Sequence, residues 1–238
     1  MPPLTVITFK WRPGHGLPAK FHSRHVNVLA AMVRRHYPHP HRFVCVTDDP
    51  LGLDPSVKAV PLWSDHGKMV NPHGPAYPSC YRRLKLFSRD IGELLGERLV
   101  SLDLDCVITR DLSPLWNRPE DFVIWGATNP TTHYNASMIL MTAGARPQVW
   151  EDFDPATSPK AAKAARQFGS DQGWISYRLG KGEAMWSAEH GVYAWQVHLK
   201  HGREPLPKNA RVVFFNGKRH NPWDAEPQAH EWVRENWR

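Results

Sequence analysis

Two aspartates stand one residue apart inside an apolar stretch of the sequence. The stretch SLDLDCVIT, residues 101–109, is typical of a buried strand apart from Asp103 and Asp105. Residues two apart in a strand project to the same face, so the two carboxylates would point together. They would repel each other and lose hydration unless a cation compensates. Since Mg²⁺ and Mn²⁺ commonly take one or two carboxylates together with substrate phosphates, the pair predicts a divalent cation site.

The elements around this pair alternate between strand and helix. Residues 4–9 and 42–50 are typical of strands, and residues 23–38 between them carry apolar side chains at helical spacing. This order predicts parallel strands joined by a right-handed crossover. Ligands of parallel sheets bind beyond the carboxyl ends of the strands, where Asp103 and Asp105 lie. The pattern is short, however, and it also fits aspartates that end a strand and cap the next turn.

The rest of the chain continues the alternation. Apolar periodicity predicts one helix over residues 80–96, ahead of the strand that carries the aspartates. Residues 63–80 contain several glycines and prolines and predict a long loop, which we interpret as a lid or a wall of the acceptor site. Further strands are expected at 122–126, 137–141 and 211–215, and further helices at 145–153, 159–168, 171–179 and 225–237. No repeat or linker divides the sequence, which favours a single α/β domain over residues 1–238.

The composition is typical of a packed globular protein with a basic surface. The 238 residues are 41% hydrophobic, and 30 Lys and Arg against 23 Asp and Glu give a formal net charge of +7. This charge favours an anionic partner such as a nucleotide or, through peripheral contact, a membrane surface. No basic run is long enough for a nucleic-acid-binding arm. Three cysteines without a paired pattern, and no signal-like or membrane-spanning stretch, predict a cytoplasmic protein.

Five stretches, taken in order along the chain, resemble one family of enzymes. They are RRLKLF (82–87), LVSLDLDCVITRDLSPLW (99–116), YNASMILMTAG (134–144), SDQGWIS (170–176) and VVFFNGKRHNPWD (212–224). Each stretch is short, but their order is similar to that of the glycogenin-like glycosyltransferases, which have the GT-A fold and a D-x-D motif. The resemblance implies a single GT-A-like domain with a mostly parallel central sheet and helices on both faces. Residues 1–110 would form the nucleotide-sugar donor half, and residues 111–238 the acceptor side with the C-terminal signature.

The resemblance also implies a function, namely metal-dependent transfer of a hexosyl-type sugar from a nucleotide-sugar, most often a UDP-sugar, with retention of configuration. Asp103 and Asp105 would bind Mn²⁺ or Mg²⁺, which offsets charge on the leaving diphosphate. Asp171 would bind hydroxyls of the transferred sugar and stabilise positive charge at its anomeric carbon. Gln172 is a poor nucleophile and would position the sugar. The other donor-binding residues would be Thr8, Phe9, Lys10, Lys85, Leu104, Asn135, Gly217 and Lys218.

Several of these residues also have a purely structural interpretation. Asp171 is a good N-cap for a helix over residues 171–179. Lys85 fits a solvated helix position, Asn135 fits a turn before a strand, and Lys218 fits a basic surface turn. Both interpretations stay open for each of them at the level of the sequence.

The sequence departs from the family pattern at one metal position. The C-terminal signature of the family opens with a metal-binding His, and Phe214 stands in its place. There are three alternatives: His220 replaces it, the aspartates with phosphates and water suffice, or metal binding is weakened. The second is favoured, because Mg²⁺ and Mn²⁺ tolerate several waters. The missing His leaves a non-catalytic nucleotide-sugar or glycan-binding protein as an alternative function. A nucleotidyltransferase is less favoured, because residues 12–16 (RPGHG) match a phosphate-binding loop poorly. The acceptor, whether a glycan, a lipid-linked sugar or a protein, leaves no mark in the sequence.

Overall fold

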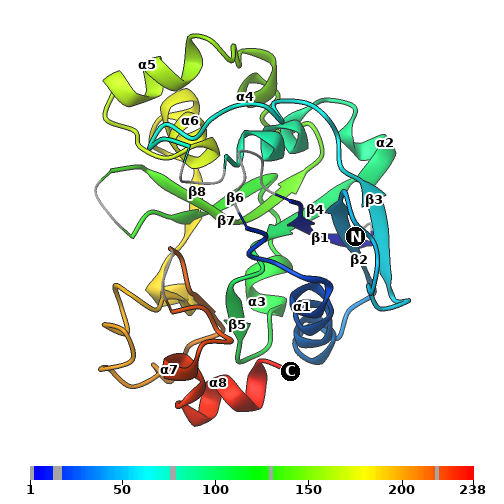
Figure 1. Ribbon diagram of the computed structural model, residues 1–238, viewed down its shortest axis with the longest axis vertical. Helices are drawn as coiled ribbons and strands as arrows, with labels where there is room; N and C mark the ends of the chain where they lie inside the picture. Colours follow the sequence, from blue (N-terminus) through cyan, green and yellow to red (C-terminus); the bar gives the residue numbers. More distant parts are fainter. Residues whose placement is uncertain (1–2, 13–17, 76–78, 129–130, 218–219) are drawn as a thin grey trace.

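A seven-stranded sheet forms the centre of the fold (Figure 1). The computed structural model describes residues 3–12, 18–75, 79–128, 131–217 and 220–238. Over these residues the strand order is β3-β2-β1-β4-β7-β6-β8; β7 is antiparallel to both of its neighbours, and the other neighbours are parallel. The strands are β1 (Leu4–Lys10), β2 (His41–Thr47), β3 (Val57–Pro61), β4 (Arg98–Leu102), β6 (Phe122–Gly126), β7 (Tyr134–Thr142) and β8 (Ala184–Trp186).

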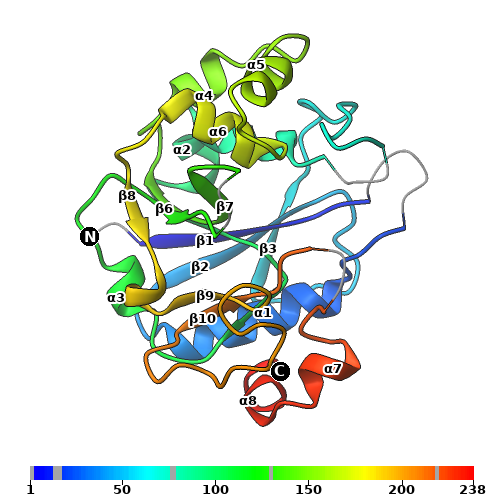
Figure 2. The ribbon, with the colours of Figure 1, turned by 90° about the vertical axis from the view of Figure 1, so that its left-hand side faces the viewer.

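Helices cover both faces of this sheet, because successive side chains of a strand point to opposite sides. The α-helices are α1 (Ser23–His36), α2 (Ile91–Leu95), α3 (Ser113–Trp116), α4 (Gln148–Glu151), α5 (Ser158–Ala164), α6 (Asp171–Leu179), α7 (Ala225–Gln228) and α8 (Glu231–Asn236); η1 (Tyr81–Phe87) and η2 (Ala188–His190) are 3-10 helices. In β1, Val6 packs into the core that contains α1, and Ile7 packs into the core that contains η1, α2 and α6. Figure 2 shows α1, α7 and α8 on one side of the sheet and α2, α4, α5 and α6 on the other.

A second, three-stranded sheet lies on the α1 side. Its order is β5 (Cys106–Ile108), β10 (Val212–Phe214) and β9 (Val192–Ala194), with β10 antiparallel to β5. Phe214 is opposite Cys106 in this pairing. The small sheet therefore holds the end of β10 beside the residues that directly precede β5, which include Asp103 and Asp105.

The fold class expected from the sequence is confirmed, but several helices differ from their expected limits. The helix expected over 159–168 ends earlier, as α5 over Ser158–Ala164. The helix expected over 80–96 is divided into η1 and α2, because Ser88 has an extended backbone with ψ 148°. The helix expected over 225–237 is divided into α7 and α8 at His230, which is also extended, with ψ 126°. The helix expected over 145–153 is reduced to α4. Among the described residues, no helix is both long and apolar enough to cross a bilayer.

Candidate active site

A cavity of about 450 Å³ lies beside the carboxyl end of β4. Five residues expected at the site from the sequence line it, and they come from four motifs: Asp103, Asn135, Asp171, Gln172 and Gly217. Other lining residues come from the 63–80 loop, from η1, from β7 and from the segment after β10: Asn71, His73, Cys80, Arg83, Ser137 and Asn216. The loop thus forms part of the cavity wall.

The two aspartates lie in a bend and not in one extended strand, which corrects the geometry expected from the sequence. Strand β4 ends at Leu102, the chain bends at Leu104 and Asp105, and β5 begins at the next residue. The Asp103 carboxylate lies at the cavity wall, whereas the Asp105 carboxylate is 2.8 Å from Lys20 Nζ. Leu104 is buried in the core and not exposed to the cavity. Burial raises the pKa of Asp105 above its ordinary value, Lys20 opposes this shift, and the Asp103 charge adds to it.

Arg83 joins two acids of the cavity. Its guanidinium contacts the Asp103 carboxylate, and its Nε donates to Asp171 Oδ2 at 2.7 Å. Burial lowers the pKa of Arg83, but Asp103 and Asp171 more than offset this, and the pKa lies well above its ordinary value. The Arg83 side chain is only 12% exposed. The guanidinium is therefore a fixed positive charge that holds the two carboxylates in place.

Lys85 lies outside this cavity, although the sequence resemblance gives it a donor contact. Its Nζ is 2.8 Å from Asp65 Oδ2. The reason is the geometry of η1, since a 3-10 helix has three residues per turn and points positions 83 and 85 in different directions. Of the basic residues in the RRLKLF stretch, Arg83 reaches the acids instead.

Helix α6 begins at the cavity with Asp171 and Gln172. Asp171 is the first residue of the helix, preceded by Ser170 as the capping position. Asp171 is therefore not the N-cap, and its buried carboxylate accepts from Arg83. Gly169 allows Gln172 to pack closely, because its φ is +109° and a Cβ there would lie 2.8 Å from Gln172 Cγ. On β7, buried Asn135 accepts from the Ser137 N–H at 2.9 Å and is a strand residue, not a turn.

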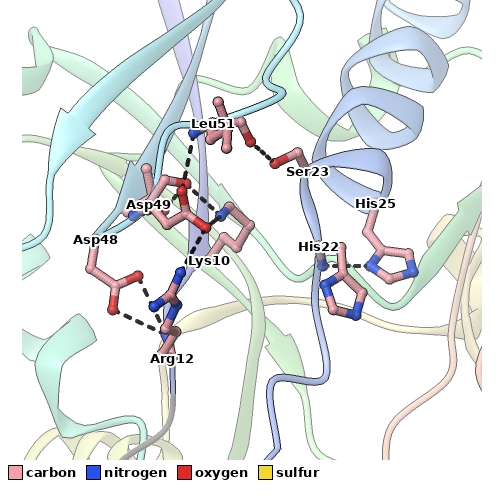
Figure 3. Close-up of polar contacts among 9 residues, drawn as sticks. Lys10, Arg12, His22, Ser23, His25, Asp48, Asp49 and Leu51 are labelled. Carbon is pink, nitrogen blue, oxygen red and sulfur yellow. Dashed lines mark hydrogen bonds and ion pairs between the residues drawn. The ribbon is translucent and has the colours of Figure 1, made fainter.

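The residues at the end of β1 form a separate polar cluster with the end of β2 (Figure 3). Lys10 Nζ donates to the Asp49 carbonyl oxygen and lies 3.7 Å from its carboxylate. The Arg12 N–H donates to Asp48 at 3.1 Å. Thr8 and Phe9 are buried, with Phe9 packed edge-on to the rings of Trp11 and Trp63. Thr8, Phe9 and Lys10 therefore lie at the carboxyl edge of the sheet but not among the residues that line the cavity.

The C-terminal signature contributes a glycine and an amide to the cavity. Gly217 has φ +110°, and a Cβ there would lie 2.7 Å from Gln196 Nε2. Lys218 lies outside the described residues. Phe214 is fully buried and stacks on Trp125, with ring centroids 4.6 Å apart, so it takes part in the core. His220 Nδ1 is 2.8 Å from Glu226 Oε2, and His220 is not a lining residue.

Asn216 has one side-chain atom that a ligand could satisfy. Its Nδ2 donates to Ser137 Oγ at 2.8 Å, while its Oδ1 is buried and has no hydrogen-bond partner among the described residues. Two residues next to Asn216 bind the aspartates through backbone hydrogen bonds. The Phe215 N–H donates to the Asp105 carbonyl oxygen at 2.7 Å, and the Ser137 carbonyl oxygen accepts from the Asp103 N–H at 2.9 Å. A buried acceptor without a donor costs free energy unless a ligand satisfies it.

The donor set fits a hard divalent cation. Within the described ranges no group of three His, Cys, Asp or Glu side chains is arranged to hold a metal. Two carboxylates and an unpaired amide oxygen, however, are the ligand types that Mg²⁺ and Mn²⁺ take, with water and phosphate for the other positions. Asp103, Asp105 and Asn216 are thus the residues that could hold such an ion.

Three residues of the candidate site are not identified from the sequence. Arg83 is one of several basic residues in its stretch, and nothing there selects it. Asn216 directly precedes Gly217 in the C-terminal signature, so its position was a usable signal. Lys20 is 85 residues from Asp105 in the chain, and no pattern connects them.

The fold has known counterparts among solved structures, whereas no protein-family model and no curated protein matches the sequence. One is the galactosyltransferase LgtC in complex with donor and acceptor sugar analogs, with TM-score 0.57 and 14% identity over 98% of this chain and 96% of that chain. The active-site mutant Q189E of LgtC gives TM-score 0.59 and 14% identity over 97% and 93% of the two chains. The glycosyltransferase GlyE of Streptococcus pneumoniae TIGR4 gives 0.62 and 11% over 98% and 61%.

These matches define the class of fold. The chain is a single α/β domain with a GT-A-like glycosyltransferase fold, as the ordered sequence motifs imply. The likeness covers nearly the full length of both this chain and LgtC.

Proposed function

We propose that the protein is a metal-dependent glycosyltransferase that moves a sugar from a nucleotide-sugar, of the UDP type, to a sugar-containing acceptor. The observation that carries the proposal is the meeting of Asp103, Asn135, Asp171 and Gln172 in one cavity of a GT-A-like fold. These residues come from three motifs far apart in the sequence. The similar fold of LgtC, which was solved in complex with donor and acceptor sugar analogs, supports sugars as both substrates.

The leaving diphosphate would bind at the bend that carries the aspartates. Asp103, Asp105 and Asn216 would hold Mn²⁺ or Mg²⁺, whose charge offsets the negative charge of the departing diphosphate. Gly217 leaves the backbone open to a phosphate oxygen, because it has no side chain. The nucleoside would occupy the edge formed by Thr8, Phe9 and Lys10.

The transferred sugar would lie between β7 and α6. Cleavage of the bond from the anomeric carbon to the diphosphate oxygen leaves an oxocarbenium-like carbon. The Asp171 carboxylate would stabilise that positive charge and accept from sugar hydroxyls, and Arg83 would hold the carboxylate in its orientation. Asn135 and Gln172 would position the ring through their amides. The acceptor hydroxyl, entering from the side of residues 71 and 73, would attack the anomeric carbon on the face from which the diphosphate leaves. Its proton would pass to the departing diphosphate oxygen, and the product would keep the configuration of the donor.

Turnover with a panel of nucleotide-sugars in the presence of Mn²⁺ tests this proposal. The wild-type protein should release UDP from at least one UDP-sugar. Asp171→Asn keeps the shape of the side chain and removes its charge, so it should lose at least about 100-fold in kcat while UDP affinity stays within about threefold. Binding of UDP-sugars without any release, across donors and sugar acceptors, would instead identify a non-catalytic nucleotide-sugar-binding protein.

A further inference from the structure

Lys20 is a second internal cation of the site, and it differs from Arg83 in how firmly it is held. Its Nζ lies 2.8 Å from Asp105 Oδ2 and 3.3 Å from the carbonyl oxygen of Gly217. The Arg83 guanidinium is enclosed by two carboxylates and is 12% exposed, whereas the Lys20 side chain has one carboxylate partner and is 35% exposed. Lys20 is therefore the cation that can leave its acid at lower cost.

The Lys20 ammonium lies beside Gly217, a residue of the cavity wall. Gly217 lines the cavity, and its carbonyl oxygen is already within contact of Lys20 Nζ. An ammonium has three N–H donors, of which Asp105 and Gly217 take two. A lysine side chain has a flexible four-carbon stem, so a rotation of the stem exposes the charge to a ligand beside Gly217.

A divalent ion at Asp105 and the Lys20 ammonium compete for the same oxygens. The Asp105 side chain is only 9% exposed, so its lone pairs are accessible from few directions. Two cations on one small carboxylate repel each other in a partly buried place. One of them must move, and the more exposed one carries a charge that a diphosphate would attract.

We propose that Lys20 is an exchangeable counter-ion of Asp105, which yields the carboxylate to a divalent cation and then binds the diphosphate of the nucleotide donor. This inference rests on the proposed function of the same cavity. In the free protein the Lys20 ammonium would neutralise the Asp105 carboxylate, and in the complex it would bind the donor diphosphate.

Binding measurements on charge variants, without any turnover assay, test the exchange. Lys20→Met keeps the length of the stem without its charge. Mn²⁺ should bind this variant about tenfold more tightly in the absence of nucleotide, and UDP should bind it about tenfold more weakly at saturating Mn²⁺. Lys200→Met is the matched control, because Lys200 forms a 2.8 Å pair with Glu204 that is largely exposed. Both affinities should stay within twofold of wild type in the control.

A second variant keeps the test decisive if Lys20→Met folds poorly in a thermal melt. Asp105→Asn removes the acid that holds the ammonium, so metal-free UDP affinity should rise about threefold or more, and Lys20→Met in the Asp105→Asn background should abolish that gain. Unchanged or weaker Mn²⁺ binding in Lys20→Met, or an Asp105→Asn gain that survives loss of Lys20, overturns the exchange alone. A wild-type protein that binds neither Mn²⁺ nor UDP overturns the exchange and the proposed function together.

Discussion

Replacement of Arg83 by Met should destabilise the protein strongly, because it leaves two acids without their shared cation. Met resembles the aliphatic stem of Arg and has no charge. Loss of one partner of a buried ion pair costs about 3–5 kcal/mol, since the remaining charge stays buried and unpaired. Asp171 is only 5% exposed and cannot recover its hydration, whereas Asp103, at 27%, can do so in part. We therefore expect about 3–5 kcal/mol of lost unfolding free energy, most of it from Asp171.

Urea denaturation at pH 7 measures this cost, and a double-mutant cycle assigns it. The double variant Arg83→Met with Asp171→Asn contains no unpaired charge at position 171. It should be more stable than Arg83→Met alone by about 2 kcal/mol, although it carries one more substitution. A loss below about 1 kcal/mol in Arg83→Met, or purely additive losses in the double variant, would contradict the role of Arg83 as the buried partner of Asp171.

Two further perturbations follow from particular contacts. Burial lowers the pKa of His25 from 6.5 to about 4, and its neutral Nδ1 accepts from the His22 N–H at 2.8 Å. As the pH falls, the unfolded chain binds the proton before the folded protein does. The contribution of neutral His25 to the free energy of unfolding is therefore complete above pH 6.5, and about 3 kcal/mol of it is lost as the pH falls to 4. Denaturation midpoints measured against pH should vary less for His25→Asn than for wild type, and identical profiles would refute the assignment. Gly217→Ala introduces a side chain at φ +110° close to Gln196, and should cost about 1–3 kcal/mol and weaken UDP binding. Gly180→Ala, at φ +66° with open space around it, should cost stability alone, and equal UDP binding in the two variants would remove Gly217 from the site.

The sequence predicts the limits of two elements correctly. The strand at 122–126 and the helix at 171–179 have the limits expected from their apolar patterns. Strands β8 and β9 were missed, because three residues each are too few to show an alternation of period two. The single helix expected over 80–96 was wrong, because apolar periodicity continues across the extended Ser88 and carries no information on its backbone.

A site residue can be predicted where it belongs to a recognisable motif, but not where packing decides which side chain reaches the site. Asp103 and Asp171 lie in the cavity as their motifs suggest. Arg83 replaces Lys85 because the 3-10 geometry of η1, which no pattern revealed, decides which basic side chain faces the acids. The bend at Asp105 likewise depends on the pairing of β5 with β10, a contact between segments about 100 residues apart in the chain.

Metal binding at the bend can be tested directly on a crystal of the protein soaked with Mn²⁺ and UDP, by the anomalous signal of manganese. We expect an ion bound by carboxylate oxygens of Asp103 and Asp105 and by Asn216 Oδ1, with a phosphate oxygen of UDP beside it. UDP present in the cavity with no manganese peak at this bend, and with Asp105 still paired to Lys20, would contradict this expectation.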